Sequence, residues 1–272
     1  MNIKRGIAIL AAAAACLLTS CSRAPDAGVL VREAKSESAA MKSCSAVVSS
    51  TLAFTANGTL HSFRSTDRLS YQAEPFAVKS VQSSDSDGAS GGSETYTVAE
   101  NGGAGFYFKG PSGWKKTGAG NLDTSPAAQI EPLRMFDRVD DQKYVRAMEL
   151  NSVKVHKIEL KLKNEVLRSA VENIVTASGM GKGSETIVQT LLDSAPPVYG
   201  YCYLAADSGK AVRLELDAAD AVNRIFTDID GSSVKVTVSK CELSCDLAGI
   251  DSTPDIALPA EAKNASSVAA EG

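Results

Sequence analysis

The sequence has few aromatic and few imidazole side chains. Of its 272 residues 6% are Phe, Trp or Tyr, Trp114 is the one tryptophan, and His61 and His156 are the only histidines. Imidazole is the commonest metal ligand among side chains. Three residues separate Cys241 from Cys245, whereas zinc knuckles and redox motifs use a spacing of two. We therefore expect neither a metal site nor a cofactor.

Basic residues are also in deficit. The chain has 28 Lys and Arg against 32 Asp and Glu, a net charge of −4. Nucleic-acid-binding surfaces need clustered Lys and Arg, so no nucleic-acid partner is expected. Beyond residue 20, no apolar run approaches the about 20 residues that span a bilayer as a helix.

The N-terminus has the layout of a secretory signal. Lys4 and Arg5 precede an apolar run from Ile7 to Leu18, which is too short for a membrane-spanning helix. The run ends in Leu18-Thr19-Ser20-Cys21, which resembles the bacterial lipoprotein signal, where the cysteine receives a diacylglycerol and becomes the first mature residue. We expect residues 1–20 to be a signal peptide, Cys21 to be the lipid attachment site, and the protein to lie on the extracytoplasmic side of the cell membrane. The alternative is an ordinary cleaved signal, with Cys21 an incidental thiol.

Four cysteines remain as structural candidates once Cys16 leaves with the signal and Cys21 is acylated: Cys44, Cys202, Cys241 and Cys245. Outside the cytoplasm, an even number predicts disulfides, here two. If residues 241–245 are extended, Cys241 and Cys245 lie about 13 Å apart, too far to bond each other. Their partners would then be Cys44 and Cys202, in an order that stays open.

The first half of the mature chain reads as a tether, a helix and many strands. Residues 21–28 predict a short tether, and apolar residues at helical spacing predict a helix over 29–42. Asn57-Gly58 between alternating strands predicts a tight hairpin. Residues 82–93 are nearly all small or polar, so we expect a mobile loop there. Three short strands should follow, and then a helix that starts at Ser125-Pro126.

The second half combines one-sided strands with amphipathic helices. In 153–163 the apolar phase changes, which predicts a bulge near His156-Lys157. Asn164 is expected to cap the first of two amphipathic helices within 164–193. Three more strands follow, with a second bulge ahead of Cys241. One-sided strands with helices on the buried face predict an α+β fold, as a single domain over 29–264 with a flexible tail at 265–272.

This layout resembles the LolA/LprG-like superfamily of bacterial lipoproteins, and within it an uncharacterised membrane-anchored branch. The resemblance spans nearly the whole mature chain and rests on the order of weak motifs. These motifs are Leu18 to Cys21, Ala40-Met41-Lys42-Ser43, Glu94-Thr95-Tyr96, Phe106-Tyr107-Phe108-Lys109, Gly113-Trp114-Lys115-Lys116, the helical pair 164–193, and Ile256 to Asn264.

The resemblance implies a strongly curved antiparallel sheet, a half-barrel, whose concave face is covered by helices. In characterised relatives the enclosed cavity takes up acyl chains. Candidate lining residues here are Ile158, Leu160, Leu162, Leu167, Val171, Ile174, Ile187, Leu191 and Leu214. These are small and medium apolar side chains, which leave room for a lipid or allow the helices to fill the groove.

No catalytic constellation is evident. No serine has a nucleophile-elbow setting near His61, and His156 is expected to be a strand-face residue. We therefore expect a non-catalytic, monomeric lipoprotein that contacts the membrane through its N-terminal lipid and binds a lipid or lipoprotein acyl chain. The alternative is a surface interaction or sensory module with a filled groove and no lipid cargo.

Overall fold

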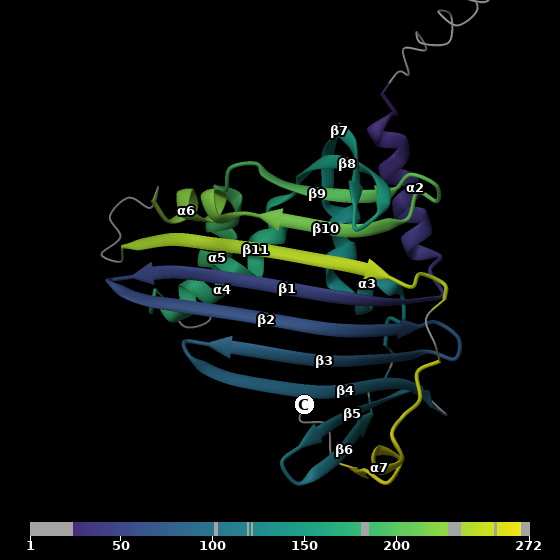
Figure 1. Ribbon diagram of the computed structural model, residues 1–272. Coiled ribbons are helices and arrows are strands. Elements are labelled where there is room, and N and C mark those ends of the chain that lie inside the picture. The colour runs from purple at the N-terminus through teal and green to yellow at the C-terminus, as the bar shows by residue number, and fades with distance from the viewer. Residues whose placement is uncertain are drawn as a thin grey trace, which may run out of the picture.

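The computed structural model (Figure 1) describes residues 24–100, 103–118, 120, 122–180, 185–227, 235–252 and 255–267. The expected signal peptide and Cys21 lie outside these residues, so both stay predictions. Among the helices in the described ranges, none is long and apolar enough to cross a membrane.

Twelve strands form one open sheet in the order β12-β6-β5-β4-β3-β2-β1-β11-β10-β9-β8-β7. All neighbours are antiparallel except β12, which is parallel to β6. The strands are β1 (Ser43–Ala56), β2 (Thr59–Gln72), β3 (Ala77–Ser86), β4 (Ala89–Glu100), β5 (Gly103–Gly110), β6 (Gly113–Gly118), β7 (Val139–Leu150), β8 (Val153–Leu162), β9 (Val198–Ala205), β10 (Ala211–Asp217), β11 (Val236–Ala248) and β12 (Ser266–Ser267).

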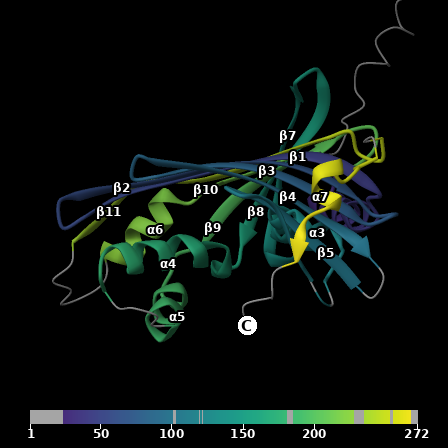
Figure 2. The same ribbon diagram turned by 90° about the horizontal axis from the view of Figure 1, so that it is seen from below.

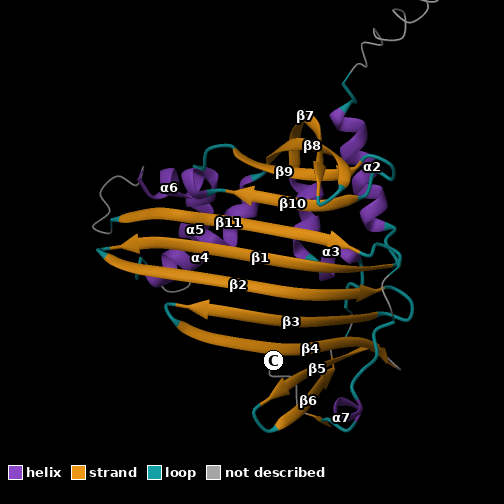
Figure 3. Ribbon diagram, viewed as in Figure 1, coloured by secondary structure: helices purple, strands orange, loops and turns teal. Residues whose placement is uncertain are grey.

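The helices gather on one face of this curved sheet (Figures 2 and 3). They are α2 (Ala27–Ala39), α3 (Pro126–Gln129), η2 (Glu131–Arg138), η3 (Asn164–Leu167), α4 (Arg168–Ala177), α5 (Glu185–Asp193), α6 (Ala219–Thr227) and α7 (Ala260–Lys263). Helices α4, α5 and α6 cover the face at one end of the strands, and α3 lies toward the other end. The predicted α+β class, a curved antiparallel sheet with helices on its concave face, is confirmed.

Local signals explain where the first elements begin and end. The Asp26 side chain accepts a hydrogen bond from the Val29 amide at 3.1 Å, so α2 begins at Ala27, two residues earlier than predicted. Asn57 and Gly58 have φ of 50° and 83° and join β1 to β2 as the predicted hairpin. Helix α3 starts at Pro126 as expected, and η2 continues from it to Arg138.

The expectation of a mobile loop at residues 82–93 was wrong. This segment is the paired outer part of β3 and β4, with Ser84 opposite Gly91 and Ser86 opposite Ala89. Backbone ladders need no apolar side chains, so polar strands can extend beyond the core. The missed signal is Asp87-Gly88, whose φ values of 51° and 84° repeat the turn geometry of the first hairpin.

One of the two predicted bulges is confirmed, and the other lies on a neighbouring strand. In β11, Ala53 pairs with Lys240 and Phe54 with Val238, so Ser239 is the extra residue, and the expected bulge ahead of Cys241 is confirmed. The other irregularity was placed on the wrong strand. Strand β8 pairs with β9 without a shift, and the extra residue is Val145 of β7, opposite Lys157 and Ile158.

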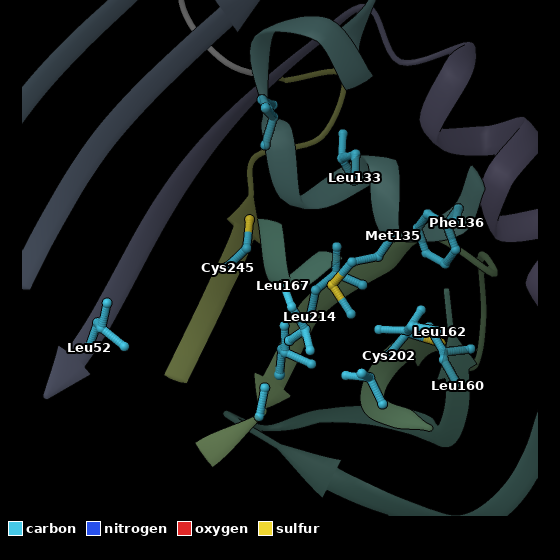
Figure 4. Close-up of a cluster of buried hydrophobic side chains, with 14 of the residues drawn as sticks. Leu52, Leu133, Met135, Phe136, Leu160, Leu162, Leu167, Cys202, Leu214 and Cys245 are labelled. Carbon is cyan, nitrogen blue, oxygen red and sulfur yellow. The ribbon is translucent and has the colours of Figure 1, made fainter. Parts of the chain in front are cut away.

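Two clusters of buried side chains hold the sheet. In the main core, side chains from β1, β2, β8, β9, β10 and β11 pack against the helical layer (Figure 4). A small second cluster at the far end packs Tyr96 and Tyr107 against Ala262 of α7. Of the segment predicted as a flexible tail, Ser266 and Ser267 pair with Lys115 and Lys116 of β6.

The prediction of two disulfides was wrong, because Cys44, Cys202, Cys241 and Cys245 are free thiols. Leu214 pairs with Cys202 on one side and with Cys245 on the other, so an intervening strand holds these two cysteines about 10 Å apart. Cys44 lies at the start of β1, four positions along from Val48, the partner of Cys245. The register therefore exceeds the reach of a disulfide, which requires Cα atoms within about 7 Å.

Candidate functional site: a groove on the concave face

An open groove of about 850 Å³ runs between the concave face of the sheet and the helical layer. Its floor comes from β1, β2, β3, β10 and β11, and its walls from η2 and from η3 and α4. The lining residues are Ser50, Thr51, Leu52, Phe63, Arg64, Ser65, Ser84, Asp85, Ser86, Glu131, Asp137, Arg138, Lys163, Glu165, Val166, Arg168, Ser169, Ala170, Asn173, Leu216, Cys241, Glu242 and Leu243.

The strand register orders the floor into two transverse rows. In the first, Leu216 pairs with Leu243, Leu243 with Ser50, Ser50 with Ser65, and Ser65 with Ser84. Facing residues on neighbouring strands share a face of the sheet. The row therefore passes from leucines on β10 and β11 to hydroxyls on β1, β2 and β3.

The second row has the same polarity. Cys241 pairs with Leu52, Leu52 with Phe63, and Phe63 with Ser86. Leu52 is 8% exposed and belongs to the main core, so the apolar end of the floor continues directly into buried packing. The floor thus has an apolar end and a hydroxyl end.

The hydroxyl end is internally bonded. The Ser50 and Ser65 Oγ atoms lie 2.8 Å apart; the hydroxyl that donates in this bond can still accept, and the other can still donate and accept. At the apolar end, burial raises the pKa of the Cys241 thiol to about 11, with smaller contributions from Asp217 and Glu242. This thiol is therefore a neutral, weakly polar part of the floor at physiological pH.

One wall is the outer side of η3 and the first turns of α4, where Val166 and Ala170 pack partly on the core. Asn164 was predicted to cap this helix, but its Nδ2 donates to the carbonyls of Leu192 at 3.0 Å and of Ala195 at 3.1 Å. It therefore joins η3 to the C-terminal end of α5 rather than starting α4.

The other wall is η2, and its charges are paired. Asp137 Oδ1 lies 2.7 Å from Lys35 Nζ of α2, and Arg138 lies 3.1 Å from Glu131. The Lys163 amide donates to the Arg138 carbonyl at 2.9 Å, which fixes the end of η2 to the end of β8. The two walls are thus tied together where they meet.

The predicted cavity-lining residues lie beside this groove and do not line it. Ile158, Leu160, Leu162, Leu167, Val171, Ile174, Leu191 and Leu214 are buried in the main core, and Ile187 packs against that core partly buried. Figure 4 shows Leu160, Leu162, Leu167 and Leu214 among these side chains. The groove is lined instead by their neighbours Val166, Ala170 and Leu216.

Two features of the site had no counterpart in the sequence reasoning. The serines of the floor come from three strands, and only the sheet register brings them into one row. The convex face also carries a hollow of about 650 Å³ lined by Tyr199, Tyr201, Lys157, Arg213 and Glu215, among others. A sequence signal for it existed, because Tyr199, Tyr201 and Tyr203 alternate along β9.

The side chains in and around this hollow interact closely with one another. Lys157 Nζ lies 3.9 Å from the centroid of the Tyr201 ring, a cation–π contact. The Tyr203 hydroxyl donates to Glu215 at 2.6 Å, and Arg213 bonds to the same carboxylate at 2.6 Å. Burial, followed by the bond to Glu215, raises the pKa of Tyr203 well above its usual value. The hollow is therefore bordered by the Lys157–Tyr201 cation–π contact and by the bonded Arg213–Glu215 pair.

The two histidines have local partners. His61 Nδ1 lies 2.9 Å from Asp87 Oδ2, and its ring stacks on Phe54 at 5.1 Å. His156 Nδ1 lies 3.3 Å from the Tyr144 hydroxyl. Across the described ranges, no three His, Cys, Asp or Glu side chains are grouped closely enough to hold a metal ion.

Comparison with known proteins returned structures only, since no family model and no curated protein matches the sequence. The chain is similar to LprF from Mycobacterium bovis, with 11% identity, a TM-score of 0.46, and coverage of 87% of this chain and 99% of that one. It is also similar to lipoprotein LppX from Mycobacterium tuberculosis, with 10% identity, a TM-score of 0.42, and coverage of 84% and 97%. A LolA superfamily protein from Nitrosomonas europaea matches with 11% identity, a TM-score of 0.20, and coverage of 86% and 96%. These proteins are what the chain is similar to in structure, and its ligand follows from its own residues.

Proposed function

We propose that this protein is a membrane-anchored, non-catalytic lipoprotein that binds an amphiphilic ligand with an acyl chain in the concave-face groove. The anchor is the lipid expected on Cys21, on the extracytoplasmic side of the membrane. The observation that carries the ligand proposal is the polarity of the floor. Leucines at one end suit hydrocarbon, and the Ser50, Ser65 and Ser84 hydroxyls at the other end suit an ester or a headgroup.

The size of the groove supports this class of ligand. Small-molecule sites commonly enclose about 300–1,000 Å³, and the groove measures about 850 Å³. Each methylene removed from water contributes about 0.8 kcal/mol. Even a partly seated acyl chain would therefore bind, with the paired charges of η2 remaining at the rim.

Ala170→Trp tests the proposal. Ala170 is partly buried on the groove wall, and an indole there would displace part of an acyl chain. Loss of two methylene contacts would cost about 1.6 kcal/mol, or about 15-fold in affinity. Native mass spectrometry of the protein purified from bacteria should show bound lipid in the wild type and much less in the variant.

Thr176→Trp is the matched control, because Thr176 is an exposed residue of the same helix and does not line the groove. It should retain its lipid. A wild-type protein without co-purifying lipid, and with no uptake of added phospholipid, would reject the ligand proposal. That result would favour the alternative, a surface module whose helices fill the concave face.

A further inference from the structure

The β7–β8 hairpin carries exposed apolar side chains that the groove does not use. Leu150 faces Val153 across the turn at its tip. Val153 is 40% exposed, and Val145, the extra residue of β7, is 43% exposed. Large apolar side chains this open to water are few in the described chain, and two of them share this hairpin.

The hairpin projects on the side of the molecule where the described chain begins. Figure 1 places β7 and the N-terminal end of α2 at the same edge of the molecule, and the two elements contact each other. The first turn of α2 lies against β7. Gly28 is so close to Gln142 of β7 that a Cβ atom added to the glycine would lie 3.2 Å from Gln142 Nε2. Val29, in the first turn of α2, is 38% exposed and adds to the apolar surface on this side.

The chain between Cys21 and α2 is short. Asp26, the N-cap of α2, follows Cys21 by five residues. Fully extended, that distance is at most about 18 Å. A lipid on Cys21 would therefore hold the start of α2, and with it the hairpin, close to the bilayer surface.

The charge near the tip of the hairpin has the sign that an anionic bilayer attracts. Residues 143–154 contain Lys143, Arg146 and Lys154 and one acidic residue, Glu149, so this segment carries a net charge of +2. Removal of residues 1–20 leaves 26 basic and 32 acidic side chains, a net charge of −6 for the mature chain. The four charged side chains of residues 143–154 are exposed, and none forms an ion pair within the described residues. Basic side chains near a membrane bind anionic headgroups.

We propose that the β7–β8 hairpin is a second membrane contact that docks on the anionic bilayer surface. Leu150 and Val153 enter the boundary between headgroups and acyl chains, and Arg146 and Lys154 contact lipid phosphates. The inference rests on the lipid anchor of the proposed function and adds an orientation to it. A second contact at a separate point strengthens membrane attachment beyond what the lipid anchor gives alone.

Tryptophan fluorescence tests the contact in the full lipidated chain. Trp114→Phe removes the single native indole, and Val153→Trp places a reporter at the tip. In vesicles of phosphatidylcholine and phosphatidylglycerol in equal parts, the reporter should show blue-shifted emission and quenching by brominated acyl chains. In phosphatidylcholine alone, both effects should weaken.

Leu60 provides the matched control. It is 67% exposed and lies on β2, opposite Thr55 of β1 and beside the Asn57-Gly58 turn. Trp114→Phe with Leu60→Trp should give solvent-like emission in the same vesicles. Equal emission and equal quenching from the two reporters in anionic vesicles would overturn the proposal.

Two further measurements keep the proposal open to refutation. Arg146→Glu with Lys154→Glu should abolish the difference between anionic and neutral vesicles, and persistence of that difference would reject the role of charge. Should Val153→Trp fail to fold, hydrogen exchange of the wild type should slow over residues 145–154 in anionic vesicles, and unchanged exchange there would reject the contact.

Separate measurements test the proposed function. The intact mass of the purified protein reports whether Cys21 carries acyl chains, and native mass spectrometry reports the groove ligand. If Cys21 is not acylated, anionic vesicles added to the unlipidated protein still report the hairpin by the same quenching. The anchor, the ligand and the hairpin can thus fail one at a time.

Discussion

Leu214→Ala should destabilise the fold far more than Leu216→Ala. The two leucines lie on the same face of β10, two residues apart. Leu214 is 1% exposed and sits between Cys202 and Cys245, whereas Leu216 is 7% exposed and lines the groove. The same substitution at the two positions therefore compares a residue of the closed core with a residue of the groove wall.

The magnitudes follow from transfer and cavity terms. Each substitution removes three carbon atoms, which is about 2.4 kcal/mol at about 0.8 kcal/mol per methylene. At Leu214 the neighbours cannot fully close the space, so a further 1–2 kcal/mol is expected, about 4 kcal/mol in all. At Leu216 the new space joins the open groove and adds little, so the loss should be about 2 kcal/mol.

Urea unfolding followed by far-UV circular dichroism measures both losses. With a slope of about 2 kcal/mol/M, the midpoint should fall by about 2 M for Leu214→Ala and by about 1 M for Leu216→Ala. Equal shifts would refute the reasoning. They would place Leu214 at an open cavity and restore the ligand-lining role that the sequence predicted for it.

Two other predictions concern the thiols and one ion pair. Burial raises the pKa of Cys44, Cys202 and Cys245 to about 12. At pH 8 these thiols should therefore react with a disulfide reagent slowly in the native protein and fast in urea. Fast labelling of any of the three in the native protein would contradict their burial. Asp251 bonds to Lys210 at 2.6 Å and to the Lys42 amide at 2.8 Å, which lower its pKa below its usual value. Its stabilising effect is present above the unfolded pKa and lost as pH falls through the folded one. Asp251→Asn should therefore cost about 1 kcal/mol at pH 7 and progressively less below about pH 4 in urea titrations, and a constant loss across that range would contradict the assignment.

The parts of the fold that were predictable carry their signals locally. Asn57-Gly58 has to be a turn because both residues accept positive φ, and Ser125-Pro126 starts a helix because proline suits the first helical turn. The change of apolar phase before Cys241 required an extra residue, which is Ser239. In each case a few neighbouring residues decide the conformation.

The site was less predictable because it depends on register across distant strands. Ser50, Ser65, Ser84 and Leu243 meet only after four strands have paired, and no single segment contains that information. The same register keeps Cys202 from Cys245. The amphipathic stripe of α4 indicated which side packs inward, but it did not indicate that Ala170 lies at the open edge of that packing.

The free thiols have a consequence for how the molecule is made. Because no covalent cross-link among Cys44, Cys202, Cys241 and Cys245 holds the sheet, its assembly depends on packing and backbone pairing and needs no oxidant. A chain that lacks residues 1–20 should reach the same conformation in the reducing interior of a bacterial cell, and adding dithiothreitol to the purified protein should leave its melting temperature unchanged.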